Sequence, residues 1–189
     1  VMIHEDLVNY FDSFKQYQLV IDKYPFSDRS AEIVKRQYDI GNKLLEGEDY
    51  KSKFFTTIKG TNYDIIEIFQ TVIKNAPYGD FAPPSQYKIG LYLMENNLYQ
   101  EARDEFEKVI NDYPESEWVQ AAKYQIAVAD AKRSSDAAYD QKITQAAVEE
   151  FEDFLEVYPD AELSEKAKKQ VHSLRDKEAE NQYMIASFY

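Results

Sequence analysis

An aromatic residue stands eight positions before a proline at four places in this chain, and this spacing constrains the fold more than any other feature. The four pairs are Tyr17/Pro25, Phe69/Pro77, Phe106/Pro114 and Phe151/Pro159. Proline has no backbone N–H to donate and disfavours helical geometry in the residue before it. Apolar residues between each pair recur with the period of an α-helix. The sequence therefore predicts four amphipathic helices that each end near a proline.

Residues 99–116 contain the clearest copy of this pattern. Its apolar positions are Ala102, Phe106, Val109, Ile110 and Tyr113. They fall on one stripe of a helix, while Glu, Asp, Lys and Arg occupy the solvated face. Ser116 is placed to cap the next helix by accepting a backbone N–H. In the first helix, over residues 5–23, the same reasoning predicts a buried stripe of Phe14, Tyr17, Val20, Ile21 and Tyr24.

A second motif, Tyr-x-Ile-[Gly/Ala], precedes most of these helices. Its copies begin at Tyr38, Tyr87, Tyr124 and Tyr183. The small residue allows two helices of a hairpin to approach closely, and the isoleucine fills the space beside it. The order Ile89, Gly90, Ala102, Phe106, Pro114 has the spacing of a tetratricopeptide repeat.

The predicted fold class is all-α, with tandem helical hairpins of the tetratricopeptide type forming a right-handed solenoid. We expect a single domain over residues 1–189. Its parts are a partial first repeat (1–25), a second repeat with an insert at 48–61 (26–77), a complete repeat (78–114), a repeat with a loop insert at 134–141 (115–159), and a long helix that opens an incomplete further repeat (160–189).

Composition argues against several classes of function. A formal charge of −13 disfavours nucleic-acid binding, which needs basic surface. The absence of cysteine removes disulfides and thiolate metal sites. His4 and His172 lie on separate elements, so they form neither a zinc site nor a catalytic triad. Acidic pairs such as Glu149-Glu150 are interpreted as solvated helix faces. We therefore expect a protein that is not an enzyme and has no metal or cofactor.

Protein partners are the expected ligands, and the helix before each proline-terminated helix is the expected place for them. The candidate contact residues are Tyr38, Tyr87, Leu91, Met94, Glu95 and Tyr124. Tyrosine three positions before the small residue tends to face the groove of such repeats, and methionine suits an adaptable binding surface. The alternative is packing in the core with the hydroxyl reaching water. Both interpretations stay open.

The insert contains the one patch of basic and aromatic residues in this acidic chain. Its members are Lys51, Lys53, Phe54, Phe55 and Lys59. One interpretation is a solvated loop with phenylalanine tucked beneath it. The other is contact with a membrane surface or an acidic partner.

The segment from Leu174 to Tyr189 resembles the end of BamD, the outer-membrane protein assembly lipoprotein. It reads Leu-Arg-Asp-Lys-Glu-Ala-Glu-Asn-Gln-Tyr-Met-Ile-Ala-Ser-Phe-Tyr. The tandem repeats, the Tyr-Pro helix ends and the loop before Ile143 are also similar to that family. The resemblance covers most of the chain and is most specific from Ala147 to Tyr189.

This resemblance implies a periplasmic scaffold of the machinery that inserts β-barrels, whose partners are an assembly subunit or an unfolded barrel substrate. It also implies a lipid anchor on an N-terminal cysteine. The first residues lack the basic start and long apolar centre of a signal peptide, and Val1 begins inside a helical pattern, so we expect a mature or trimmed chain whose original N-terminus is missing. The alternatives are a periplasmic cell-envelope coordination protein that resembles the CpoB type, or a generic tetratricopeptide adaptor.

Overall fold

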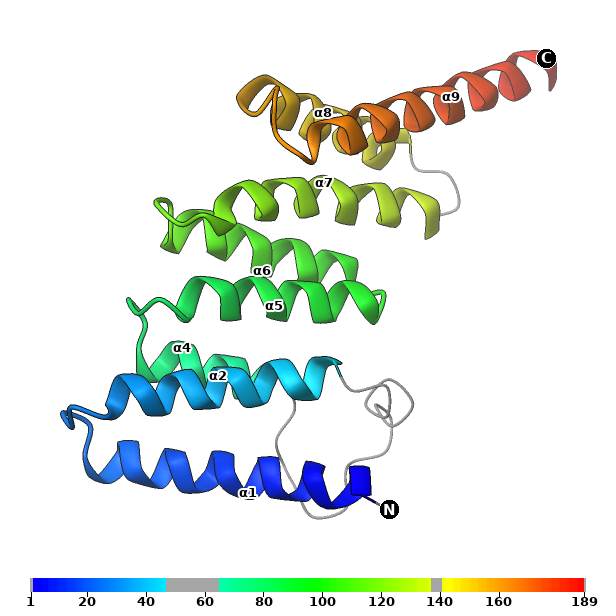
Figure 1. Cartoon of the computed structure of the whole chain (residues 1–189). Coiled ribbons are helices and arrows are strands. Elements are labelled where there is room, and N and C mark those ends of the chain that lie inside the picture. The colour runs from blue at the N-terminus through cyan, green and yellow to red at the C-terminus, as the bar shows by residue number, and fades with distance from the viewer. Residues whose placement is uncertain (1, 47–64, 137–140, 189) are drawn as a thin grey trace. The chain divides into compact units, whose positions relative to one another are not determined.

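The computed structural model describes residues 2–46, 65–136 and 141–188, and all regular secondary structure in these ranges is α-helical (Figure 1). The chain divides into two compact units, Val1–Tyr92 and Leu93–Tyr189. The all-α prediction is confirmed. The basic and aromatic residues of the insert, Lys51, Lys53, Phe54, Phe55 and Lys59, lie outside the described residues.

The described helices follow one another along the chain. They are α1 (Met2–Lys23), α2 (Ser30–Glu46), α4 (Ile65–Asn75), α5 (Ala82–Glu95), α6 (Tyr99–Asp112), α7 (Trp118–Asp136), α8 (Gln141–Val157) and α9 (Ser164–Phe188). Asn97 has a φ of 61° in the turn between α5 and α6. Asparagine tolerates this left-handed conformation better than most residues.

Each of the four prolines in the repeated aromatic–proline pattern follows a helix that ends two residues earlier, as predicted. The last helical residues are Lys23, Asn75, Asp112 and Val157. The residue just before each proline leaves helical geometry because the proline ring clashes with it. Ser116 then accepts a hydrogen bond from the backbone N–H of Trp118 at 3.2 Å, which confirms the predicted cap of α7.

In the first unit, α2 packs between α1 and α4. Gly41 allows α2 and α4 to approach closely, because a Cβ atom there would lie 2.8 Å from the ring of Phe69. Phe69 and Val72 on α4 are fully buried, and Val72 packs in one cluster with Ile33 and Val34 of α2. The small residue of the Tyr-x-Ile-Gly motif therefore has the packing role that the sequence predicted.

Three amide side chains join the helices of this unit. Gln37 of α2 is fully buried and donates to Gln18 of α1 at 3.0 Å. Asn75 of α4 donates to Gln18 at 2.8 Å and to Gln37 at 2.9 Å. These bonds satisfy polar groups that would be costly to bury alone.

The predicted stripe of α1 is only partly correct. Phe14 and Ile21 are buried, but Val20 is 40% exposed and Tyr24 is 56% exposed. In the described residues, α2 is the one helix with an extensive contact to α1, so α1 buries a narrower stripe than a helix with two neighbours.

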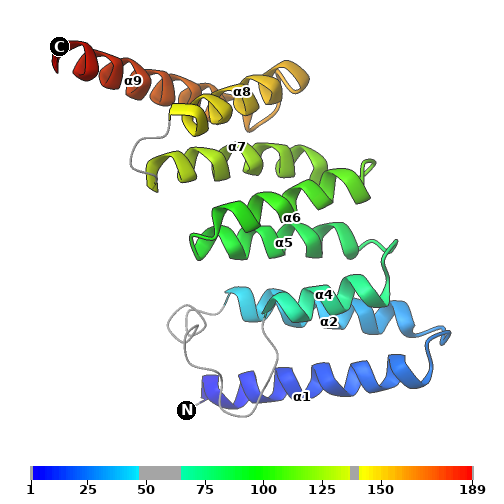
Figure 2. The same cartoon turned by 180° about the vertical axis from the view of Figure 1, so that it is seen from behind.

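In the second unit, consecutive helices pack side by side: α6 on α7, α7 on α8 and α8 on α9 (Figure 2). The core between α7, α8 and α9 is built around the buried residues Ala127, Ala147, Val148, Phe151, Phe154, Ala167 and Leu174. Alanines at the crossings let these helices approach closely while the phenylalanines fill the space between them.

Helix α7 extends to Asp136, further than the sequence indicated, and α8 begins at Gln141. The extra turn is held by a buried hydrogen bond between the hydroxyls of Ser134 and Thr144. Lys177 of α9 also donates to the backbone carbonyl of Ser134 at 3.1 Å. Serine and threonine read as loop residues from sequence, but tertiary contacts stabilise them here within helices.

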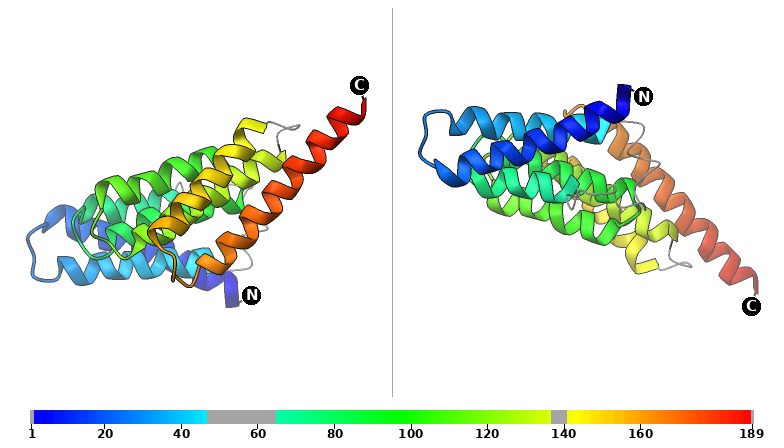
Figure 3. Two further views of the ribbon diagram at one scale, coloured as in Figure 1. Left: turned by 90° about the horizontal axis from the view of Figure 1, so that it is seen from above. Right: turned by 90° about the horizontal axis from the view of Figure 1, so that it is seen from below.

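Helix α9 crosses α8 and continues beyond it at its C-terminal end (Figure 3). Its buried residues include Ala167 and Leu174, whereas Tyr183, Met184 and Ile185 are 76%, 61% and 49% exposed. The last turns of α9 therefore present apolar side chains to solvent.

Candidate interaction groove

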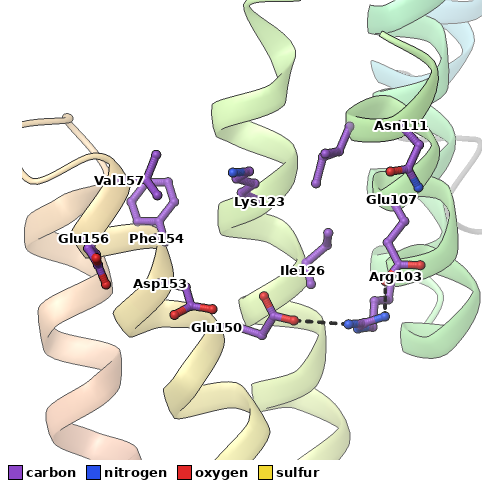
Figure 4. A pocket seen from close by; sticks show the side chains of 11 residues that line it. Arg103, Glu107, Asn111, Lys123, Ile126, Glu150, Asp153, Phe154, Glu156 and Val157 are labelled. Atoms are coloured by element: carbon purple, nitrogen blue, oxygen red, sulfur yellow. Dashed lines mark hydrogen bonds and ion pairs between the residues drawn. The ribbon is translucent and has the colours of Figure 1, made fainter. Parts of the chain in front are cut away.

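Arg103 links three consecutive helices of the second unit. It lies on α6, and its Nε donates to Oδ2 of Asp130 on α7 at 3.1 Å. Its Nη2 donates to Oε1 of Glu150 on α8 at 3.2 Å. Its Nη1 pairs with Glu107 one turn further along α6. Figure 4 shows this guanidinium between the carboxylates of Glu107 and Glu150.

Asp130 is the most deeply buried member of this network. Its side chain is 5% exposed, and its other oxygen accepts from Arg133 at 2.8 Å. Two cations on one buried carboxylate offset the cost of removing it from water. For Arg103, burial alone lowers the pKa, but Asp130, Glu107 and Glu150 together raise the pKa above its usual value. The guanidinium is therefore charged at every physiological pH.

The network borders an open groove of about 630 Å³ between α6, α7 and α8 (Figure 4). Apolar side chains from all three helices line it: Ile110, Ile126, Phe154 and Val157. Its polar lining consists of Arg103, Glu107, Asn111, Lys123, Glu150, Asp153 and Glu156. The volume lies within the range of ~300–1,000 Å³ that is typical of ligand pockets. An apolar floor with charged edges is suited to holding a peptide segment.

The predicted partner-contact tyrosines are placed mainly by packing. Tyr38 is partly buried on α2, with its ring centroid 6.0 Å from that of Phe69 and 5.1 Å from that of Phe81. Tyr124 on α7 lies 5.8 Å from Phe151 and 5.6 Å from Phe154, edge to face in both cases. Burial raises the pKa of both hydroxyls. Contact between either tyrosine and a partner stays a prediction.

The other predicted contact residues lie on α5. Tyr87 is 8% exposed, Leu91 and Met94 are partly exposed, and Glu95 is exposed. Tyr87 and Leu91 belong to the first unit, and Met94 and Glu95 to the second. Tyr124 borders the groove's floor through its contact with Phe154, but no predicted contact residue lines the groove itself.

Within the described residues, no group of His, Asp or Glu side chains is arranged to hold a metal ion. His172 is exposed, and its Nε2 lies 3.4 Å from Asp176 on the same helix. No helix in the described ranges is long and apolar enough to cross a membrane.

Two family models match parts of the chain. Residues 127–189, which cover the second half of α7 and all of α8 and α9 in the described residues, match the YfiO family, described as an outer membrane lipoprotein. Residues 85–116, which cover most of α5 and all of α6, match a tetratricopeptide repeat. A search of curated proteins found no match.

Among solved structures, the chain is similar to a crystal structure of the nearly identical TPR-like repeats of the putative kinesin light chain of Podosopora anserina. The two share 14% sequence identity with a TM-score of 0.55, over 97% of this chain and 90% of that chain. At this identity the likeness shows the fold. The fold is therefore one of tandem tetratricopeptide-type hairpins. The chain's resemblance to the BamD family is confirmed over residues 127–189.

Sequence reasoning missed the groove because it treated acidic residues as solvated helix faces. Glu107 and Glu150 are instead partly buried partners of Arg103. One signal was available: Asp130 stands between Ala129 and Ala131 in a run of small residues, where a carboxylate requires a cation from a neighbouring helix. The identity of that cation, Arg103, depends on the packing of α6 against α7.

Proposed function

We propose that this protein is a non-catalytic scaffold of the BamD type that acts at the periplasmic face of the outer membrane. Tetratricopeptide repeats are protein-interaction scaffolds, and the finer assignment is supported by one observation. The match to the outer membrane lipoprotein family falls on the second half of α7 and on α8 and α9, and α8 contributes the largest share of the groove's lining. An N-terminal lipid anchor would hold such a scaffold at the membrane.

The proposed partners are proteins, either a subunit of the barrel-assembly machinery or an unfolded barrel substrate. The proposed contacts remain Tyr38, Tyr87, Leu91, Met94, Glu95 and Tyr124, together with the insert residues Lys51, Lys53, Phe54, Phe55 and Lys59. In this proposal, a few aromatic and apolar side chains supply most of the affinity, as in other protein interfaces. The helical framework supplies a rigid surface that loses little entropy on binding.

The test is co-purification from membranes of the native cell, using the full-length protein with its own N-terminus and a C-terminal affinity tag. We expect the protein in the outer-membrane fraction and a barrel-assembly subunit among the captured proteins. Recovery in the soluble periplasm without such a subunit would contradict the proposal and favour the CpoB-type alternative.

A pair of charge reversals sharpens this test. Glu95→Arg changes a proposed contact residue that is exposed on α5, and it should reduce capture of the partner. Glu101→Arg makes the same change at an exposed position on α6 outside the proposed contacts, and it should leave capture unchanged. Equal capture by both variants would remove Glu95 from the proposed contact surface.

A further inference from the structure

The groove between α6, α7 and α8 combines an apolar floor with an acidic edge. Ile126 and Phe154 are nearly fully buried and form the base. Val157 is 56% exposed, so a large apolar side chain remains open to a ligand at the end of α8. Covering this surface removes apolar area from water, which favours binding of another apolar group.

The edge of the groove carries two kinds of carboxylate. Glu107 and Glu150 already have a cation, because both pair with Arg103. Asp153 and Glu156 are exposed and have no ion-pair partner among the described residues. They lie three positions apart on α8, so they share one face of the helix. A ligand can therefore reach two carboxylates beside the exposed Val157.

The second cation of the lining, Lys123, forms no ion pair with these carboxylates among the described residues. Lys123 lies on α7, and its Nζ is 5.7 Å from the centroid of the Tyr158 ring, which is a favourable cation–π arrangement. Arg103 is occupied by three carboxylates. The four acids and two bases of the lining give a local excess of negative charge, in a chain whose formal charge is already −13.

We propose that this groove binds an extended protein segment in which a lysine or arginine is next to an apolar side chain. The inference rests on the proposed scaffold function and names the chemistry of the partner at this site. The apolar side chain covers Val157 and the floor, and the cationic group reaches Asp153 and Glu156. The alkyl stem of a lysine or arginine also packs on apolar surface while its charged end stays at the edge. Charge complementarity of this kind selects basic segments over acidic ones.

The probe is a set of three short fluorescein-labelled peptides of equal length, measured by fluorescence anisotropy with the full chain. The first alternates leucine with arginine, the second leucine with glutamate, and the third serine with arginine. We expect the leucine–arginine peptide to bind tightest. The leucine–glutamate peptide loses charge complementarity, and the serine–arginine peptide loses the apolar contact. Binding should weaken with added salt, because the acidic edge is exposed. Equal binding of the three peptides would overturn the proposal.

Two variants locate the binding. The double change Asp153→Lys and Glu156→Lys should weaken binding of the leucine–arginine peptide by about tenfold, because two attractions become repulsions. The matched control, Asp176→Lys with Glu180→Lys, adds the same charge at exposed positions of α9 that do not line the groove. It should change binding by less than about threefold. An equal loss in both variants would show that the peptide senses only the net charge, which overturns the proposal.

The apolar part of the site is tested by Val157→Ser. Val157 is exposed, so the fold should tolerate this change. The leucine–arginine peptide should bind this variant several-fold more weakly, while the serine–arginine peptide should be unaffected. If Val157→Ser weakens the binding of both peptides equally, or weakens the binding of neither, the proposed apolar contact is contradicted.

The two proposals fail in different ways. If the Asp153/Glu156 variant binds the leucine–arginine peptide as the unaltered protein does, the groove assignment is wrong, whatever the outer-membrane co-purification gives. If the unaltered protein is absent from the outer-membrane fraction but binds the peptides in the predicted order, the BamD-type function is wrong and the groove assignment stands.

Discussion

The buried carboxylate of Asp130 offers the sharpest test of how the second unit is held together. Asp130→Ala removes the acceptor that Arg103 and Arg133 share, at 3.1 Å and 2.8 Å. Both cations then remain near an interface without their deepest partner. Removing one member of a buried ion pair costs ~3–5 kcal/mol in unfolding free energy.

The expected loss of unfolding free energy for Asp130→Ala is smaller than this, because Arg103 is partly exposed and keeps two other carboxylate partners. The side chain of Arg103 is 24% exposed, so water compensates part of the lost interaction. Arg103 also keeps Glu107 and Glu150. We therefore expect Asp130→Ala to lower the free energy of unfolding by about 2–3 kcal/mol. Glu107→Gln, whose side chain is 41% exposed, should cost only about 0.5 kcal/mol.

The assay is urea unfolding followed by tryptophan fluorescence. Trp118 is the chain's single tryptophan and the first residue of α7, so its signal reports on the unit that contains Asp130. Circular dichroism at the same urea concentrations tests whether the whole chain unfolds in one transition. A double-mutant cycle with Arg103→Met should give a coupling of about 1–2 kcal/mol with Asp130→Ala. A cost below about 0.5 kcal/mol, or strict additivity in the cycle, would refute the role assigned to this network.

Three further changes test other parts of the fold. Gly41→Ala should destabilise the first unit by about 1–2 kcal/mol, because the new Cβ meets the Phe69 ring at 2.8 Å; a stabilised variant in thermal unfolding would show that α4 can move away. Phe106→Ala should cost ~3–5 kcal/mol, because the side chain is fully buried; a loss near zero in urea unfolding would show that the repeat phase is wrong. Since burial raises the pKa of Tyr124, its hydroxyl should ionise above the ordinary pKa of ~10. The contribution of the protonated Tyr124 hydroxyl to the free energy of unfolding is fully present below the unfolded-state pKa, and it is lost as the pH rises through the folded-state pKa. Ultraviolet titration of the unaltered protein and of Tyr124→Phe checks this, because the difference between the two curves gives the ionisation of Tyr124. A difference curve with the ordinary tyrosine pKa would contradict the prediction.

The helices were predictable because the signals that set them are local. A proline after several helical turns ends the helix through its own geometry, so the ends at Lys23, Asn75, Asp112 and Val157 follow from sequence alone. The close approach at Gly41 was also predictable, because only a small residue fits between packed helices. The extent of α7 was not, since Ser134 is stabilised in a helix by partners that come later in the chain.

The groove was less predictable than the helices for a related reason. An acidic residue on an amphipathic helix has the same sequence signature whether it faces water or a cation on the next helix. Glu150 and Asp153 stand three positions apart on α8, yet one pairs with Arg103 and the other is open to a ligand. Only the packing of α6, α7 and α8 separates these two roles.

The copies of the Tyr-x-Ile-[Gly/Ala] motif show what the motif itself requires. Ile40 and Ile126 are 6% and 4% exposed where α4 and α8 pack on their helices, and Tyr38 and Tyr124 lie against phenylalanines of those same helices. Ile185 and Tyr183 have the same spacing on α9, but they are 49% and 76% exposed, and no later helix in the described residues covers them. Burial of the motif therefore depends on the next helix and does not follow from the motif alone. The tyrosine ring is first a packing surface for that helix, so a partner would have to be contacted through the part of the ring and hydroxyl that the packing leaves open.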